Sequence, residues 1–148
     1  MRSLKSFFSP ADEKAILEAI REAESRTSGE IRVRVERKAG KDPMAVAHQA
    51  FDALGMRNIE LRHGVLFLVA TEDRSFVILG DAGIHAKVPR GFWNKVRDVV
   101  IKHFRKKAFA KGLVEGIKLA GEQLATFFPH QAADVNELPD AISYADEN

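Results

Sequence analysis

The spacing of apolar residues along the chain predicts four amphipathic helices. Apolar residues recur every three or four positions in four stretches, which is the spacing that places them on one face of a helix. The predicted helices span residues 10–25, 43–54, 92–104 and 113–127. Ser9-Pro10 and Asp42-Pro43 each supply a capping side chain followed by a first-turn proline, so they predict where the first two helices begin.

Three other stretches have the pattern of β-strands. Residues 31–35 alternate Ile or Val with Arg, which predicts a half-buried strand with a charged outer face. Residues 64–70 are apolar on both faces, as is typical of a central strand that helices cover on each side. A turn at residues 71–74 leads to a third strand at residues 76–79, so these two strands are expected to form a hairpin.

The order of these elements, α-β-α-β-β-α-α, predicts an α/β fold. The first and second strands are connected through a helix, and a crossover of this kind makes two strands parallel. We therefore expect a three-layer α/β/α sandwich in which a small mixed β-sheet carries helices on both faces.

Composition limits the classes of protein to consider. A chain of 148 residues with 45% hydrophobic and 30% charged residues is typical of one globular domain. Because it has no cysteine, disulfides, thiolate metal sites and thiol nucleophiles are excluded. The longest apolar run, residues 65–70, is far shorter than the roughly 20 residues that span a bilayer. With no apolar segment of signal-peptide length near the N-terminus, a cytoplasmic location is expected.

The charge is unevenly distributed along the chain. The whole chain carries 23 Lys and Arg against 21 acids, but residues 129–148 hold five of those acids and no Lys or Arg. Residues 1–128 therefore carry 23 minus 16, or +7. We divide the chain into a domain over 1–128 and an acidic, loosely held tail over 129–148. The imbalance is compatible with an anionic partner, with a tail that folds over the basic surface, or with solubility alone.

The expected hairpin brings a small set of titratable residues to one end of the sheet. If the turn is centred on residues 72–73, Gly64 pairs with Asp81, and His63 lies beside Ala82. His63, Asp81 and His85 then converge, and a carboxylate with two imidazoles can bind a divalent metal or perform acid–base chemistry. The alternative is structural, because Asp81 stands between Gly80 and Gly83 and can cap the next helix.

A run of cations marks a second candidate site. Between positions 95 and 111 there are seven cations and one acid, Asp98. Arg97 is one of the seven, and the six that we take as candidate partner-binding residues are Lys95, Lys102, Arg105, Lys106, Lys107 and Lys111. Such a cluster can bind an anionic membrane, an acidic protein or a phosphate group, or remain a solvated helix face. Nucleic acid is not favoured, since Trp93 and Phe104 fall on the apolar stripe.

Three blocks of the sequence resemble the TPM domain family. They cover about residues 10–128 and comprise Thr27–Val33, the strand pair His63–Val69 and Arg74–Ile84, and Phe104–Lys106 followed by Gly112–Ile117. The resemblance implies a compact α/β/α sandwich. It also implies a kinship with thylakoid-lumen phosphatases, with calcium-binding bacterial members, and with partners such as LemA-like membrane proteins. This chain is similar to the short, soluble bacterial members.

One departure from the family bears on its metal site. Many relatives have Asp-Asn-Gly or Asp-Asp-Gly before the second strand, where this chain has Arg62-His63-Gly64. Calcium takes oxygen ligands almost exclusively, so a cation and an imidazole in these places argue against calcium. Asp81 remains as the carboxylate near this position, and the identity of any divalent metal stays open.

Two functions follow from these features. The leading hypothesis is a noncatalytic TPM-type binding module, acting through the basic helix 95–111 at an acidic protein surface or an anionic membrane face, and functioning as a monomer. The alternative is a metal-assisted phosphatase that hydrolyses phosphomonoesters at Asp81, with His63 or His85 as a further ligand or acid–base group.

Overall fold

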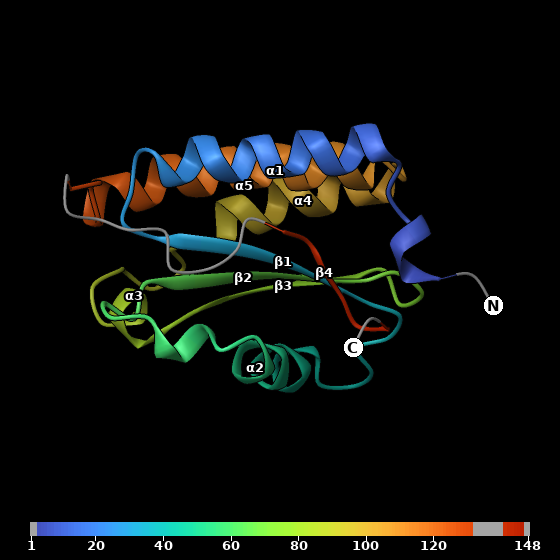
Figure 1. The fold of residues 1–148 in the computed structure, drawn as a ribbon, viewed down its shortest axis with the longest axis horizontal. Helices are drawn as coiled ribbons and strands as arrows, with labels where there is room; N and C mark the ends of the chain where they lie inside the picture. Colours follow the sequence, from blue (N-terminus) through green and yellow to red (C-terminus); the bar gives the residue numbers. More distant parts are fainter. Residues whose placement is uncertain (1–2, 132–140, 147–148) are drawn as a thin grey trace.

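The computed structural model describes residues 3–131 and 141–146. Within them the chain forms a four-stranded sheet between two layers of helix (Figure 1). The elements follow the predicted order α-β-α-β-β-α-α, with a short helix and a fourth strand added to it. The α/β fold and the three-layer arrangement predicted from the sequence are therefore confirmed.

The sheet contains both parallel and antiparallel pairs. Its strands are β1 (Glu30–Glu36), β2 (Gly64–Ala70), β3 (Ser75–Gly80) and β4 (Ser143–Tyr144), in the order β3-β2-β1-β4. β1 pairs with β2 and with β4 in parallel, whereas β2 and β3 form the predicted antiparallel hairpin. In that hairpin Val65 pairs with Gly80 and Ala70 with Ser75, which is the register expected from a turn at residues 72–73.

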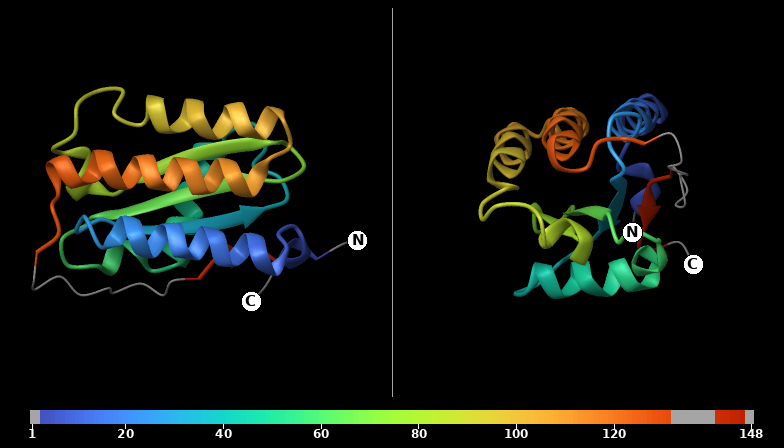
Figure 2. Two further views of the ribbon diagram at one scale, coloured as in Figure 1. Left: turned by 90° about the horizontal axis from the view of Figure 1, so that it is seen from above. Right: turned by 90° about the vertical axis from the view of Figure 1, so that its left-hand side faces the viewer.

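The helices divide between the two faces of the sheet. The long helices α1 (Pro10–Glu24), α4 (Asn94–Arg105) and α5 (Phe109–Phe127) lie side by side over one face, and α2 (Pro43–Ala53) covers the other (Figures 1 and 2). The remaining helices are short: α3 (Ala82–His85) and the 3-10 turns η1 (Leu4–Ser6) and η2 (Met56–Asn58). The predicted caps form, because Ser9 accepts from Asp12 N at 3.0 Å and Asp42 accepts from Ala45 N at 3.1 Å.

Each face of the sheet has its own hydrophobic core. Along β2, Val65, Phe67 and Val69 pack under the three long helices, while Leu66, Leu68 and Ala70 pack against α2. All seven residues of β2 are buried, which confirms that it is a central strand covered from both sides. Within the described ranges, no helix is both long and apolar enough to cross a membrane.

The prediction of a charged outer face on β1 is wrong in part. Arg32 is only 8% exposed, and its Nε donates to the carbonyl of Ala141 at 3.3 Å. Burial lowers the pKa of Arg32, and the neighbouring charge of Arg34 lowers it further. The alternating pattern gave no sign of this cover, because the segment that supplies it is more than a hundred residues away in the sequence.

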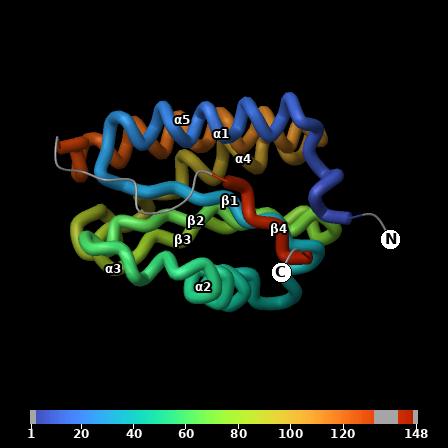
Figure 3. Tube along the Cα trace, in the orientation of Figure 1, coloured from blue at the N-terminus to red at the C-terminus, as the bar shows by residue number. Residues whose placement is uncertain are grey.

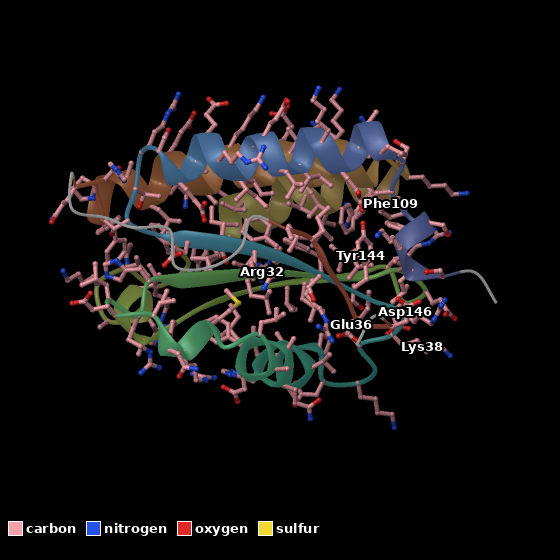
Figure 4. The ribbon with its side chains drawn as sticks, viewed as in Figure 1. Arg32, Glu36, Lys38, Phe109, Tyr144 and Asp146 are labelled. Atoms are coloured by element: carbon pink, nitrogen blue, oxygen red, sulfur yellow. The ribbon has the colours of Figure 1, made fainter. Side chains whose placement is uncertain are left out.

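That covering segment belongs to the stretch set apart as an acidic tail. Residues 143–144 form β4 beside β1, and the amide of Ala145 donates to Val35 O at 2.9 Å. Tyr144 and Asp146 lie on this side of the sheet with Glu36 (Figure 4), and the path of the segment along β1 can be followed in the tube view (Figure 3). The sheet thus has one strand more than predicted, whereas residues 132–140 and 147–148 lie outside the described residues.

Candidate functional site

The hairpin places Asp81 at the end of β3 as the sequence register predicted. The amide of Asp81 donates to Gly64 O at 2.9 Å, and the amide of Gly83 donates to Arg62 O at 3.1 Å. The Asp81 carboxylate accepts from the amide of Ala82 at 2.7 Å and so caps the four-residue helix α3. The capping role proposed as the structural alternative is therefore present.

Two arginines hold the Asp81 carboxylate in place. Arg62 forms a bidentate pair with it, through Nε at 2.6 Å and Nη2 at 2.7 Å, and Nη1 of Arg57 lies 3.6 Å away. The Asp81 side chain is fully covered, while that of Arg62 is 41% exposed. Burial acts to raise the pKa of Asp81, but the hydrogen bonds from Arg62 and Ala82 and the two positive charges outweigh it, so the pKa is lowered.

Asp81 and His85 line the same pocket, and His63 lies elsewhere. The pocket has a volume of about 360 Å³ and is formed by His48, Phe51, Arg57, Leu79, Gly80, Asp81, Ala82 and His85. His63 instead forms a 2.8 Å hydrogen bond between its Nδ1 and Ser28 Oγ, with its ring 4.5 Å from that of Phe128. The three residues share one end of the sheet, but only two of them face a common space.

This arrangement does not fit a metal site. Both Asp81 oxygens already accept hydrogen bonds from Arg62, and one of them also caps α3. No group of three His, Cys, Asp or Glu side chains in the described part of the chain is placed to hold a metal ion. A metal at Asp81 would have to displace a guanidinium from a covered carboxylate. The phosphatase centred on Asp81 remains a prediction.

Sequence reasoning missed the two arginines of this site. The hairpin register sets residue 62 opposite residue 83 and so indicates that Arg62 lies near Asp81, but the adjacent His63 was predicted as the partner. Arg62 also has a left-handed backbone, with φ of 56°, and sequence pattern does not indicate that for an arginine. Arg57 lies in η2, a three-residue turn that is too short to show a periodic pattern in the sequence.

The second candidate site, the cationic face, consists of exposed cations on α4, directly after it and at the start of α5. We define it by the six predicted cations, all of which are exposed: Lys95, Lys102, Arg105, Lys106, Lys107 and Lys111. Lys95, Lys102 and Lys106 are spaced by seven and four residues, so they lie along one side of the helix. Val96, Val100 and Phe104 are buried on the opposite side, against α5 and β3.

None of the six cations forms an ion pair with a described residue. Asp98 is the acid on α4, and it is exposed. The described part of the acidic stretch, residues 141–146, lies on the β4 side of the sheet, whereas α4 packs over β3 at the opposite edge (Figure 2). These residues therefore do not cover the cationic face.

The two aromatic residues near the cationic face, Phe104 and Trp93, differ in how far they are buried. Phe104 is buried as predicted, with its ring 5.7 Å from Phe76 and 5.0 Å from Phe109. Trp93, also predicted to belong to the core, packs against it but stays partly exposed at the residue before α4. It packs edge-on against Phe92 at 4.8 Å and forms part of a surface groove.

Comparison with known proteins settles the family. The TPM domain matches residues 2–123, which is most of the chain. The chain belongs to the TPM domain family. No curated protein matched this chain.

Solved structures of similar proteins agree with this TPM fold. The NMR structure of the BA42 protein from the psychrophilic bacterium Bizionia argentinensis is 44% identical, with a TM-score of 0.89, and the match covers 97% of this chain and 99% of that one. The N-terminal domain of a P. gingivalis protein is 22% identical, with a TM-score of 0.68 over 84% and 82%. The N-terminal domain of cg2496 from Corynebacterium glutamicum, 14% identical, has a TM-score of 0.61 over 95% and 83%. The last two show likeness of fold alone.

Proposed function

We propose that this TPM domain is a noncatalytic binding module that docks through its cationic face on an anionic surface, either an acidic protein or the anionic face of a membrane. The observation that carries the proposal is a set of six exposed cations around α4 that have no acidic partner among the described residues. Unpaired surface charge of one sign attracts surfaces of the opposite sign and speeds encounter with them.

The packing of α4 supports docking rather than insertion. The apolar stripe of α4, Val96, Val100 and Phe104, is buried in the core, and its other apolar residues, Val99 and Ile101, are half-buried, so the helix has no fully exposed apolar face for the interior of a bilayer. The large hydrophobic side chains that are exposed among the described residues, Met44, Leu61 and Phe127, lie outside α4. The contact with an anionic surface would therefore be electrostatic, and salt would weaken it.

The geometry at Asp81 supports a binding module over the phosphatase alternative. The carboxylate that would ligate a metal or assist hydrolysis is covered and paired with Arg62. A general base or metal ligand needs a free oxygen that faces its substrate. The Asp81 oxygens instead cap α3 and anchor Arg62.

The test measures binding to vesicles of stated charge. The domain is sedimented with vesicles that mix phosphatidylserine, an anionic lipid of the cytoplasmic leaflet, with phosphatidylcholine, and with vesicles of phosphatidylcholine alone. We expect binding to the anionic vesicles, and we expect its loss in the variant Lys102→Gln, Arg105→Gln, Lys106→Gln. A parallel arm replaces vesicles by immobilised poly-glutamate, which presents the charge of an acidic protein.

A matched variant separates charge from position. Lys5→Gln, Lys14→Gln, Lys41→Gln removes the same charge from three exposed lysines outside the cationic face. We expect it to bind as the unmodified domain does. Equal losses in the two variants would show that net charge alone matters, and no binding to either probe would refute the proposal.

A further inference from the structure

β3 is the free edge of the sheet. It is the outer strand on its side, six residues long, with β2 as its partner and no further strand beyond it among the described residues. Proteins commonly block such edges with a lysine, a proline or a bulge. β3 contains no lysine and no proline, and its pairing with β2 runs without a bulge. The edge is therefore open to a further strand.

The register shows which backbone groups face outward. Asp81 N donates to Gly64 O, so in this antiparallel pair Asp81 and every second residue before it point their amides and carbonyls toward β2. The intervening residues Phe76, Ile78 and Gly80 point theirs away from the sheet. No described residue satisfies these outward groups. They offer three donors and three acceptors at the spacing that an added strand requires.

A groove of about 600 Å³ meets this edge at Ile78, the middle one of the three residues with outward backbone groups. Met44 of α2 lies on one side and Arg97 of α4 on the other, with Ile78 of β3 between them. Since α2 and α4 cover opposite faces of the sheet, a groove that touches both must cross the outer edge of β3. Trp93 and Phe92 add aromatic surface next to α4.

The charge of the groove selects its occupant. Its lining contains two arginines, Arg90 and Arg97, and no acidic side chain. Arg90 and Arg97 form no ion pair with a described residue, and the side chain of Arg97 donates to Asn94 Oδ1 at 3.4 Å. A second copy of this chain paired edge to edge would bring these arginines toward their own counterparts, which is unfavourable. An acidic segment would neutralise them.

We propose that the edge of β3 is a docking site for an extended acidic peptide of a partner protein, which adds to the sheet as a fifth strand. Main-chain hydrogen bonds to Phe76, Ile78 and Gly80 would hold the peptide. Side chains of an added strand alternate between the two walls of the groove. Acidic residues would face Arg90 and Arg97, and apolar residues at the intervening positions would face Met44.

The test uses a designed peptide and the single tryptophan of the chain. The probe is acetyl-Glu-Val-Glu-Val-Glu-Val-Glu-amide, titrated into the full-length domain while the emission of Trp93 is followed. Amide hydrogen exchange is measured by NMR in the same samples. One control peptide has lysine in place of glutamate, and another is N-methylated at the alternate amides that would bond to β3.

We expect saturable binding of the acidic peptide and slower exchange at the amides of Phe76, Ile78 and Gly80. N-methylation and the variant Arg90→Gln, Arg97→Gln should each weaken binding by about tenfold or more, because each removes charge-assisted or main-chain hydrogen bonds. The pair Lys14→Gln, Lys41→Gln is the control of equal charge and should bind as the unmodified domain does.

Three results would overturn the proposal: unchanged exchange at these amides, undiminished binding of the N-methylated peptide, or amide protection that rises with protein concentration without peptide. The last would identify a second copy as the occupant. The site is separate from the cationic face, so Lys102→Gln, Arg105→Gln, Lys106→Gln should leave peptide binding within about twofold. Failure of one proposal can thus be distinguished from failure of the other.

Discussion

Asp81 combines three structural roles in one covered carboxylate. It caps α3, it pairs with Arg62 in two hydrogen bonds, and it lies within 3.6 Å of Arg57. A buried carboxylate needs compensating charge and hydrogen bonds, and the two arginines supply them without a metal ion. Arg62 itself has a positive φ, so the residue that pairs with Asp81 also holds a strained backbone conformation.

Replacing Asp81 by Asn should destabilise the domain and remove a pH-dependent contribution. The amide keeps the size of the side chain but loses the charge, and we expect a loss of about 2 kcal/mol in the free energy of unfolding at pH 7. The pKa of Asp81 is lowered in the folded state, so its stabilisation is fully present above the ordinary carboxyl pKa of about 4 and declines as the pH falls through the lower folded value.

Urea unfolding of both proteins at pH 7, 5, 4 and 3 measures this difference. The gap in unfolding free energy should be widest at pH 7 and should narrow below about pH 4. Asp73 also has a lowered pKa, because the amides of Gly40 and Ala39 donate to it. It is present in both proteins, so its contribution cancels in the difference between their unfolding free energies. A gap that stays constant over this range would contradict the role assigned to the Asp81 charge.

At the scale of elements, the sequence predicted what depends on local periodicity. The helices α1, α2, α4 and α5 and the strands β1 to β3 were found because each has a regular apolar pattern and clear end signals. Helix α3 was missed because four residues hold too little pattern, although Asp81 was predicted as a possible cap of the next helix. β4 was missed because two residues in an acidic stretch show no alternation. Its position depends on contacts with β1 that only folding creates.

The contact between α4 and α5 depends on a glycine. A Cβ built at Gly116 would lie 2.4 Å from the Cγ2 of Val100, a stiff β-branched side chain that is fully buried. Gly116→Ala should therefore lower stability by about 1–2 kcal/mol, even though alanine favours the helix by up to about 1 kcal/mol. Urea denaturation measures whether the free energy of unfolding falls or rises. A rise would mean that the helix propensity of alanine outweighs the clash with Val100.

A double-mutant cycle tests the cause of this loss. Val100→Ala removes the methyl groups that the new Cβ would meet, so the combined variant should lose at least about 1 kcal/mol less than the sum of the single losses. Additive losses would mean that Gly116 acts through something other than its contact with Val100. The cycle thus assesses the helix packing separately from the general cost of each substitution.

β4 should contribute measurably to the stability of the whole sheet. Tyr144 is 4% exposed, and its hydroxyl donates to the carboxylate of Glu13. Tyr144→Ala should cost about 3 kcal/mol through lost packing, and Tyr144→Phe about 1 kcal/mol through the lost hydrogen bond. Thermal unfolding detects this as a lowered Tm, at about 3 °C per kcal/mol for a domain of this size. Unchanged Tm values in both variants would contradict the pairing of this strand.

At the scale of the whole molecule, charge and open surface gather on the same side. The cationic face lies on the outer side of α4, and the groove runs from α4 to the edge of β3 at Ile78. The described acidic residue of the C-terminal segment, Asp146, lies across the sheet, bonded to Leu4 N and Arg37. The run of cations could be predicted from the sequence, and the exposure of all six is confirmed. The groove could not be predicted, because residues from α2, β3 and α4 meet only in the folded sheet.

Because the charge is concentrated on one side of the molecule, binding of the domain to an anionic surface should depend on salt. Variants inside and outside the cationic face should change that salt dependence differently. Screening shortens the reach of a charge from about 10 Å at 0.1 M salt to about 3 Å at 1 M. We expect the fraction bound to phosphatidylserine vesicles to fall at least tenfold over about this range, since the proposed contact is mainly electrostatic. Vesicle sedimentation across a salt series measures the slope. Lys102→Gln, Arg105→Gln, Lys106→Gln should flatten the slope, and Lys5→Gln, Lys14→Gln, Lys41→Gln should preserve it. Binding that persists at 1 M salt would point to an apolar contact and contradict docking through the cationic face.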